Sequence, residues 1–359
     1  MSDTPLWKDI AAQPDNLAAV VRHLYGPERE RLSAAAEFVR NEKPIVFVAI
    51  GSAAYLSMVA ECYLNRHRHF ACVINASDAL YTCFSALRNV NIIINSRSGE
   101  TAEVVKLVQA LRAEGLPFLA LTNSPESTLA RLATHLVWSA SRADDLVSIN
   151  IVSGMMLASL VLSAEILGQA DSLLPLLRTL PDAFRSTLAR ATTSAEELAA
   201  LFEGVQPIYL LYRDASKGAA HCGRLVLEEV ARRPAVAMEA GEFRQGAIEV
   251  LDERFGAIVS VPPGELGALN LSLVRGIQRA GGRLLVLGEG GDLRTDSRTV
   301  PFPLPTMPLY LRPLLEIIPV QLLAYKLAER QGYSPGTVRH LSKVITSEVG
   351  IPQDNLGLG

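Results

Sequence analysis

The feature that most constrains the fold of this chain is the segment 90–101, in which an apolar run ends at a cluster of hydroxyl groups. Residues 92–94 are three consecutive isoleucines, which is typical of a buried strand. From residue 102 onwards, apolar residues recur at helical spacing. A strand that passes through a tight turn directly into a helix is typical of α/β proteins. The turn between them contains Ser96, Ser98, Gly99 and Thr101.

A turn of this composition is suited to holding a phosphate. The first N–H groups of a helix have no partners within the helix and carry partial positive charge. Hydroxyl groups can donate to the same anion, and Gly99 would let the backbone approach it because glycine has no Cβ. The same residues fit a simpler alternative, an ordinary capped helix with Ser98 at the N-cap and with Glu100 and Thr101 in the first turn. The segment alone leaves both interpretations open.

Length and composition limit the class of protein. The chain has 359 residues, of which 49% are hydrophobic, so it can bury a large core, and a prior of about 150 residues per domain predicts two domains. The net charge of −3 gives no general attraction to nucleic acid or to anionic membranes. The longest apolar run, residues 151–162, is interrupted by Ser and Gly and predicts a buried helix, so we expect no membrane span.

The cysteines and the N-terminus indicate a cytoplasmic protein. The four cysteines form no C-x-x-C pair, which favours free thiols in a reducing compartment. The first residues are polar and acidic, unlike a signal peptide. Histidines and carboxylates do not cluster at zinc-like spacings, so we expect no metal.

Strands and helices alternate along the chain, and the pattern repeats. Strands are expected at residues 44–51, 70–74, 89–95, 116–123 and 135–138, with helices between them, which predicts a parallel sheet covered on both faces. A second set of expected strands, at residues 207–212, 255–263 and 282–288, parallels the first. The chain therefore looks like a duplicated α/β unit. The second copy has Pro262-Pro263-Gly264-Glu265 where the first has its hydroxyl cluster, so the phosphate site is expected in the first copy.

Several short motifs occur in a fixed order along the chain. They are Gly51-Ser52, residues 96–101, Leu146-Val147-Ser148, Glu228-Glu229, residues 240–246, residues 319–325 and Leu341-Ser342-Lys343. With these motifs the chain resembles proteins with two SIS (sugar isomerase) domains, above all the isomerase half of glucosamine–fructose-6-phosphate aminotransferase. Fructosamine-phosphate deglycases and amino-sugar-phosphate deaminases are relatives of that enzyme. The resemblance extends from about residue 7 to residue 348.

The resemblance implies two tandem SIS domains, each a parallel sheet flanked by helices in a flavodoxin-like three-layer sandwich. We expect an N-terminal helical segment, a phosphate-binding SIS domain, a helical linker, a second SIS domain and a tail that contributes to the active site. The corresponding ranges are 1–35, 36–170, 171–200, 201–335 and 336–359. No glutaminase domain precedes the first SIS domain, so we expect that this chain does not make ammonia from glutamine.

The resemblance also implies roles for particular residues. Those that would bind the phosphate and the sugar hydroxyls are Gly51, Ser52, Ser96, Ser98, Thr101, Val147 and Ser148. Glu229 would move a proton between the first two sugar carbons, and Lys343, next to Ser342, would lie beside the carbonyl carbon and could form an imine with it. If Val226 and Cys222 share a helix face with Glu229, partial desolvation would raise the pKa of its carboxyl group. The simpler alternatives are an exposed acidic pair, Glu228 and Glu229 with Arg232 and Arg233, and an ordinary exposed lysine.

Two positions depart from the pattern of the resembled family. Gln245 stands where most active relatives have a histidine that opens the sugar ring, and glutamine cannot titrate. The substrate could then react without enzymatic ring opening, another histidine (His340 or His221) could substitute, or the protein could bind sugar phosphates without turnover. Arg97 stands where the aminotransferases usually have glutamine, and it could pair with the phosphate or with a carboxylate on the substrate.

The sequence therefore predicts a sugar-phosphate isomerase, deglycase or amino-sugar deaminase. It would need no metal and no organic cofactor, and it would act on a phosphorylated sugar as a homodimer with its active sites near the subunit interface. The alternative is a non-catalytic sugar-phosphate-binding SIS protein. Residues 1–40 are too few and too acidic for a DNA-binding helix-turn-helix, which argues against a transcriptional role. No nucleotide-binding glycine motif follows any expected strand.

Overall fold

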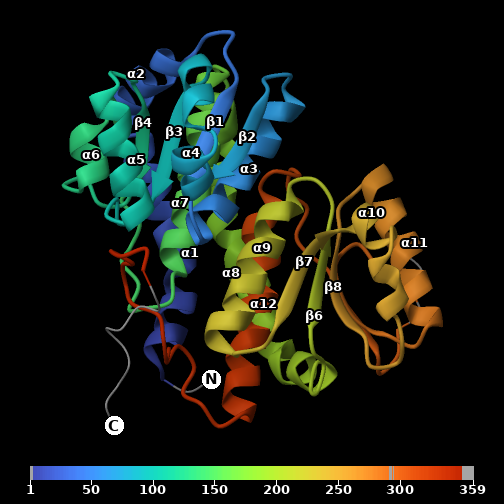
Figure 1. The fold of residues 1–359 in the computed structure, drawn as a ribbon. Helices are drawn as coiled ribbons and strands as arrows, with labels where there is room; N and C mark the ends of the chain where they lie inside the picture. Colours follow the sequence, from blue (N-terminus) through green and yellow to red (C-terminus); the bar gives the residue numbers. More distant parts are fainter. Residues whose placement is uncertain (1–2, 291–292, 294, 350–359) are drawn as a thin grey trace. The chain divides into compact units, whose positions relative to one another are not determined.

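The computed structural model describes residues 3–290, 293 and 295–349, and it divides into two compact units (Figure 1). The first unit contains residues 8–181 and the tail from residue 338. The second unit contains residues 182–337 and the N-terminal residues up to Trp7. The last ten residues of the expected tail, 350–359, lie outside the described residues. Helix α1 (Pro5–Leu24) begins in the second unit, and helix α8 (Ala170–Leu201) covers the stretch where a helical linker was expected.

The first unit is built on a five-stranded parallel sheet with strand order β2-β1-β3-β4-β5. Its strands are β1 (Ile45–Ala49), β2 (Ala71–Asn75), β3 (Asn91–Ser96), β4 (Leu119–Thr122) and β5 (His135–Trp138). One group of helices that contact one another comprises α2 (Arg29–Val39), α3 (Ser52–Arg66) and α7 (Asn150–Ile166). The other group comprises α4 (Ala76–Tyr81), the 3₁₀ turn η1 (Phe84–Asn89), α5 (Ala102–Ala113) and α6 (Thr128–Leu132).

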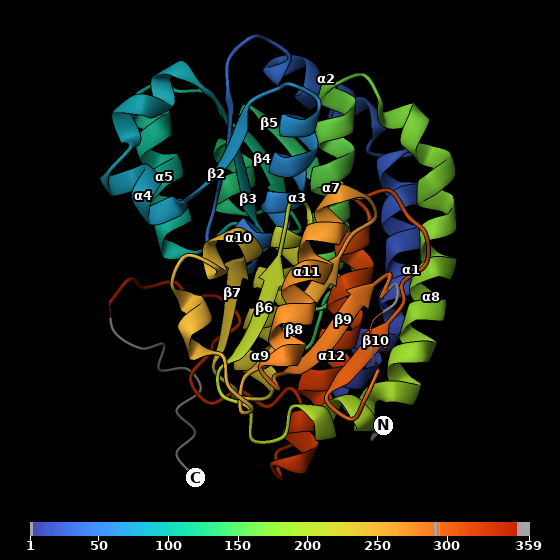
Figure 2. The same ribbon diagram turned by 90° about the vertical axis from the view of Figure 1, so that its right-hand side faces the viewer.

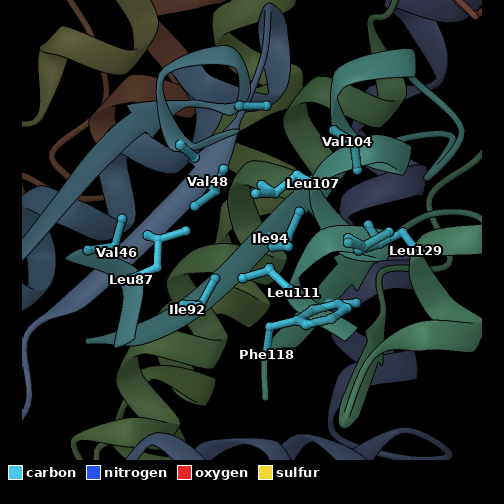
Figure 3. Packing of buried hydrophobic residues seen from close by; sticks show 14 residues of the cluster. Val46, Val48, Leu87, Ile92, Ile94, Val104, Leu107, Leu111, Phe118 and Leu129 are labelled. Atoms are coloured by element: carbon cyan, nitrogen blue, oxygen red, sulfur yellow. The ribbon is translucent and has the colours of Figure 1, made fainter. Parts of the chain in front are cut away.

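Side-chain alternation along the strands explains the core between the sheet and α5. Figure 3 shows Val46 and Val48 of β1 and Ile92 and Ile94 of β3 facing the same cluster as Leu107 of α5. Residues two apart in a strand point to the same face, so each strand contributes alternate side chains to this cluster. The other side chains of β1 are also buried, as expected for a central parallel strand covered on both faces.

Helix α7 is buried at every position from Asn150 to Ile166. The interrupted apolar run at residues 151–162 is therefore a buried helix, as predicted from its composition. In the described ranges, no helix combines the length and the apolar character needed to cross a membrane.

The second unit repeats the topology of the first, with strand order β7-β6-β8-β9-β10 (Figure 2). Its strands are β6 (Ile208–Tyr212), β7 (Ala235–Glu239), β8 (Gly256–Val261), β9 (Arg283–Gly288) and β10 (Thr299–Phe302). Helices α9 (Ser216–Val230) and α12 (Arg312–Arg330) pack together, while α10 (Ala240–Phe243), the turn η2 (Ala247–Val250) and α11 (Glu265–Arg279) form a second group. The expected duplicated α/β fold is confirmed.

Candidate functional site

Strand order places two of the sequence motifs at one edge of the first sheet. The chain leaves β1 towards β2 and leaves β3 towards β4, which lie on opposite sides, so the order of the strands reverses between β1 and β3. Open α/β sheets bind their ligands at this switch point, outside the carboxyl ends of the strands. Gly51 and Ser52 follow β1 closely, and residues 97–101 follow β3, so both motifs flank the switch point.

The turn after β3 is organised by its own hydroxyl groups. The Oγ of Ser96 accepts the Gly99 N–H at 3.1 Å, and the Oγ of Ser98 accepts the Glu100 N–H at 3.2 Å. A hydroxyl that accepts a hydrogen bond can still donate its own hydrogen. Ser98 is half-buried, so the turn can present its hydroxyl as a donor to an oxyanion without losing this internal bond, whereas Ser96 is 4% exposed.

The helix that follows this turn is not capped in the simple way considered above. Helix α5 begins at Ala102, its N-cap residue is Thr101, and the Thr101 side chain makes no capping hydrogen bond. The alternative that places Ser98 at the N-cap is wrong, because the hydroxyl of Ser98 bonds within the turn before the helix begins. The half-buried hydroxyl of Thr101 thus adjoins the positive end of the α5 dipole.

Gly99 is required by packing as well as by its backbone angle. Its φ is +64°, and a Cβ built there would lie 2.2 Å from the Oγ of Ser127 and 3.0 Å from the Cβ of Leu129. The glycine therefore lets the turn pack against the start of α6, whereas the sequence suggested closeness to a ligand. Two further bonds fix this contact: the Glu100 carboxylate accepts the Thr128 N–H at 2.5 Å, and the Gly99 carbonyl accepts the Leu129 N–H at 3.2 Å.

Arg97 connects the turn to the loop that precedes α7. Its Nη1 donates to the Oγ of Ser148 at 2.8 Å. That loop is held by Asp144, a residue not singled out from the sequence, whose side chain is 4% exposed. Its carboxylate accepts the N–H groups at the start of α7, from Ile149, Asn150 and Ile151, at 2.8–3.0 Å. An acidic residue shortly before an apolar helix was the available signal.

The C-terminal tail lies against the same turn. The Ile345 carbonyl accepts the N–H of Ala102 at 3.0 Å, and the Nζ of Lys343 lies 3.4 Å from the Asp144 carbonyl oxygen. The Oγ of Ser342 donates to the Val344 carbonyl at 2.9 Å. In Figure 1 the red tail runs beside the green loop that precedes α7. Within the first unit, the structure thus brings Arg97, Ser148 and the tail together, while His340 is exposed.

Glu229 lies in the second unit, on α9. It is half-buried, and Cys222 and Val226 on the same helix are 2% and 5% exposed. Burial raises the pKa of the Cys222 thiol to about 12, and the negative charge of Glu229 contributes to this rise. The neighbouring Glu228 pairs with Arg224 at 2.5 Å, whereas Arg232 lies over the ring of Tyr333. The simpler alternative was an acidic pair, Glu228 and Glu229, held by Arg232 and Arg233, and for Glu228 the bond found is to Arg224.

Gln245, which stands where the resembled family has a histidine, and His221, a candidate to replace that histidine, also lie in the second unit. Gln245 is exposed and follows α10, next to Gly246 with a φ of +147°. His221 on α9 is half-buried, with its Nε2 3.4 Å from the Tyr212 hydroxyl. Burial is the main cause that lowers the pKa of His221 to about 4, and the positive charges of Arg224 and Lys217 lower it further. The imidazole is therefore neutral near pH 7. In the described part of the chain, no three His, Cys, Asp or Glu side chains form a group that could hold a metal ion.

A turn organised by serine hydroxyls lies at the switch point of a parallel α/β sheet, the place where such sheets bind their ligands. Residues 38–164 match the SIS domain family. The first unit thus contains a match to the SIS domain, and the second unit has the same strand order.

Curated relatives include two aminotransferases. The glutamine–fructose-6-phosphate aminotransferase of Pyrobaculum aerophilum is 29% identical over 349 residues, which cover 95% of this chain and 57% of that protein. The corresponding enzyme of Pyrococcus horikoshii is 25% identical over 351 residues, with the same coverage. The chain thus spans little more than half the length of these relatives.

Solved structures share the fold at lower identity. The C-terminal domain of glucosamine-fructose-6-phosphate aminotransferase from Francisella tularensis superposes with a TM-score of 0.83 and 20% identity, over 93% of this chain and 98% of that one. Tagatose-6-phosphate ketose/aldose isomerase from Escherichia coli gives a TM-score of 0.77 and 16% identity, over 93% and 95%. Glucosamine-6-phosphate deaminase from Thermotoga maritima gives 0.72 and 19%, over 95% and 99%.

Proposed function

We propose that this protein is an enzyme that isomerises, deaminates or deglycates a phosphorylated keto- or amino-sugar. The observation that most supports this is the turn after β3, where hydroxyl groups and the α5 N-terminus adjoin a switch point. The names of the relatives, which include aminotransferases, isomerases and a deaminase of sugar phosphates, agree with a sugar phosphate as the ligand. The resemblance adds to this proposal a homodimer with active sites near the subunit interface, and the cysteine pattern adds a cytoplasmic location.

The proposed binding step places the phosphate dianion at the turn. The hydroxyls of Ser52, Ser96, Ser98 and Thr101 would donate to its oxygens. Charge-assisted hydrogen bonds of this kind are shorter and stronger than neutral ones. The segment around Val147 and Ser148 would contact the sugar hydroxyls, and Arg97 already reaches Ser148.

The proposed chemical step is a proton transfer by Glu229. An aldose–ketose conversion needs one base that takes the proton from one carbon and returns it to its neighbour, through an enediol. The Lys343 amine would attack the carbonyl carbon and release water, forming an imine that makes the adjacent C–H more acidic. In an amino-sugar without this adduct, proton transfer from C2 to C1 would turn the C2 amine into a C2 imine, and addition of water to that imine would release ammonia and leave the keto-sugar.

One observation favours a second function, the binding of sugar phosphates without turnover. Gln245, where the resembled family has a titratable histidine, has no proton to shuttle during ring opening. Loss of a general acid–base typically costs about 10²–10⁴-fold in rate. His221 and His340 are the candidates to replace it, and a substrate that reacts in its open-chain form would need neither.

A substrate panel tests the proposed function. The protein would be incubated in D₂O with fructose 6-phosphate, glucosamine 6-phosphate and phosphorylated fructosamine adducts, and NMR would follow deuterium entering C1 or C2. We expect enzyme-dependent exchange with at least one of them, because the proposed base equilibrates with solvent. Calorimetric binding without exchange or turnover would favour the non-catalytic function, and no binding of any of these sugar phosphates would contradict both.

Replacement of Arg97 by glutamine is expected to change substrate preference. A charged hydrogen bond contributes about 1.5–3 kcal/mol, so R97Q should weaken binding of carboxylated fructosamine adducts by about 10-fold or more. Fructose 6-phosphate should lose less, because the turn hydroxyls still hold its phosphate. Calorimetric Kd values for both ligands provide the measurement, with Arg112→Gln, which removes an exposed arginine of the same unit, as the control. Equal losses for both ligands would rule out a carboxylate-binding role.

A further inference from the structure

The tail segment 342–348 contacts the rest of the first unit at two places. One contact is at Glu348, and the other is between Ile345 and the N-terminus of α5. The Oε2 of Glu348 accepts hydrogen bonds from the Tyr81 hydroxyl at 2.7 Å and from the Lys106 Nζ at 2.9 Å. Three residues earlier, the Ile345 carbonyl accepts the Ala102 N–H. We call Tyr81, Lys106 and Glu348 the tail clasp.

Helix geometry explains why these contacts act together. Ala102 and Lys106 are four residues apart on α5, so they lie on the same face, about 6 Å apart along the axis. The tail runs along that face, with a backbone carbonyl over the first helical residue and a carboxylate one turn further on. The Ala102 N–H belongs to the first turn of the helix, where N–H groups lack partners within the helix. The tail and a phosphate at the turn would thus use the same end of α5.

The charges in the clasp favour the docked tail. The hydrogen bond from the Lys106 ammonium is the main cause that lowers the pKa of Glu348 below its ordinary value, and the hydrogen bond from the Tyr81 hydroxyl adds to it. The carboxylate therefore stays ionised near neutral pH. The side chain of Lys106 is 53% exposed and that of Glu348 is 19% exposed. A partly exposed ion pair is weak and is screened by salt, so the clasp can open and close reversibly.

We propose that Glu348 is a positioning residue, which the tail clasp holds so that the tail lies on the α5 N-terminus and Lys343 lies beside the loop that precedes α7. This inference rests on the proposed function only for the role of Lys343 in the chemistry. The clasp fixes one end of a short segment whose other end contains Lys343, 3.4 Å from the Asp144 carbonyl. An open clasp would leave the Lys343 amine spread over many positions, and the loss would fall on imine formation more than on phosphate binding.

Lys106→Met and Glu348→Gln test this proposal, because both remove the ion pair at an exposed position. Arg112→Met is the matched control, since it removes an exposed positive charge from the last turn of the same helix. A double variant with Lys106→Glu and Glu348→Lys restores the pair with reversed charges. The readouts are hydrogen–deuterium exchange of the tail peptide and of Ala102, borohydride trapping of fructose 6-phosphate on Lys343 by mass spectrometry, and calorimetric binding of inorganic phosphate.

We expect K106M and E348Q to speed exchange in the tail and to lower the trapping rate by about 3- to 10-fold, as for a partly exposed charged contact. R112M should match the wild type, the double variant should recover most of the trapping, and the Kd for phosphate should change less than about 3-fold. Rising ionic strength should reproduce the effect of K106M in the wild type. Unchanged tail exchange and trapping in K106M, or no recovery in the double variant, would overturn the proposal.

Failure of the proposed function gives a different pattern. A wild-type protein that binds no sugar phosphate and forms no trapped adduct would remove the chemical role of Lys343, and with it the positioning role of Glu348. A wild-type protein that traps the sugar, with K106M trapping equally well, would leave the proposed function intact and contradict the clasp alone.

Discussion

Replacement of Glu229 by glutamine is expected to lower kcat/KM for the proposed sugar-phosphate conversion by about 10²–10⁴-fold, the usual effect of removing a general base. Glutamine keeps the size of the side chain and cannot accept a proton at neutral pH. Glu229 is half-buried, beside Cys222 and Val226, on a helix of fifteen residues, so a positioned base would be lost without a large change in packing. Steady-state kinetics and the exchange of the C1 hydrogen of fructose 6-phosphate with solvent deuterium measure the effect.

Glu228→Gln is the matched control for this prediction. Glu228 is the next residue on the same helix and pairs with Arg224 on the surface, with 34% of its side chain exposed. Such a pair contributes about 0–1 kcal/mol to stability, so E228Q should retain nearly full activity. Both variants should bind inorganic phosphate like the wild type, because the proposed phosphate donors lie in the first unit. Full activity in E229Q, or an equal loss in E228Q, would contradict the assigned role.

Replacement of Gly99 by alanine is expected to destabilise the phosphate turn and to abolish most of its binding. The positive φ costs an L-residue about 1–2 kcal/mol. Overlap of the new Cβ with Ser127 and Leu129 adds about 1–3 kcal/mol, because the atoms it meets include Cβ atoms that cannot rotate away. Native-state hydrogen exchange of the β3 and α5 amides should report the loss of stability. Calorimetry with inorganic phosphate should show a Kd at least about 10-fold weaker.

The chain provides a control that separates backbone strain from steric overlap. Gly115, just beyond the end of α5, has the same φ of +64°, and a Cβ there would meet nothing within 4 Å. G115A should therefore lose only the stability that a positive φ costs an alanine, and it should bind phosphate normally. If G99A is as mild as G115A in both measurements, the turn is either more adaptable than the contacts indicate or not the phosphate site.

Much of the architecture could be predicted from local patterns. Central strands such as β1 and β3 are runs of β-branched and apolar residues, and the hydroxyl turn after β3 shows where a parallel strand meets its helix. The edge strands β7 and β10 were not predicted. Four of the five residues of β7 are only half-buried, and β10 contains Pro301, which strand patterns exclude except at edges.

The candidate site was predicted in its residue types and less well in its contacts. The motif gave Ser96, Ser98 and Thr101, but the position of the N-cap depended on backbone angles that a local pattern does not fix. Gly99 was assigned to ligand approach, although its neighbour is Ser127, 28 positions along the chain. The roles proposed for Glu229, Lys343 and Gln245 came from the resemblance to SIS proteins, since a local pattern does not assign them.

The sequence by itself determined the parallel α/β class, the internal duplication and the location of the hydroxyl turn, because hydrophobic periodicity and turn chemistry act over a few neighbouring residues. Tertiary structure alone decided that Arg97 reaches Ser148 and that Glu348 meets Lys106 and Tyr81. These contacts join polar side chains from separate elements, some more than 200 residues apart, and a polar residue leaves no periodic pattern that reveals its distant partner.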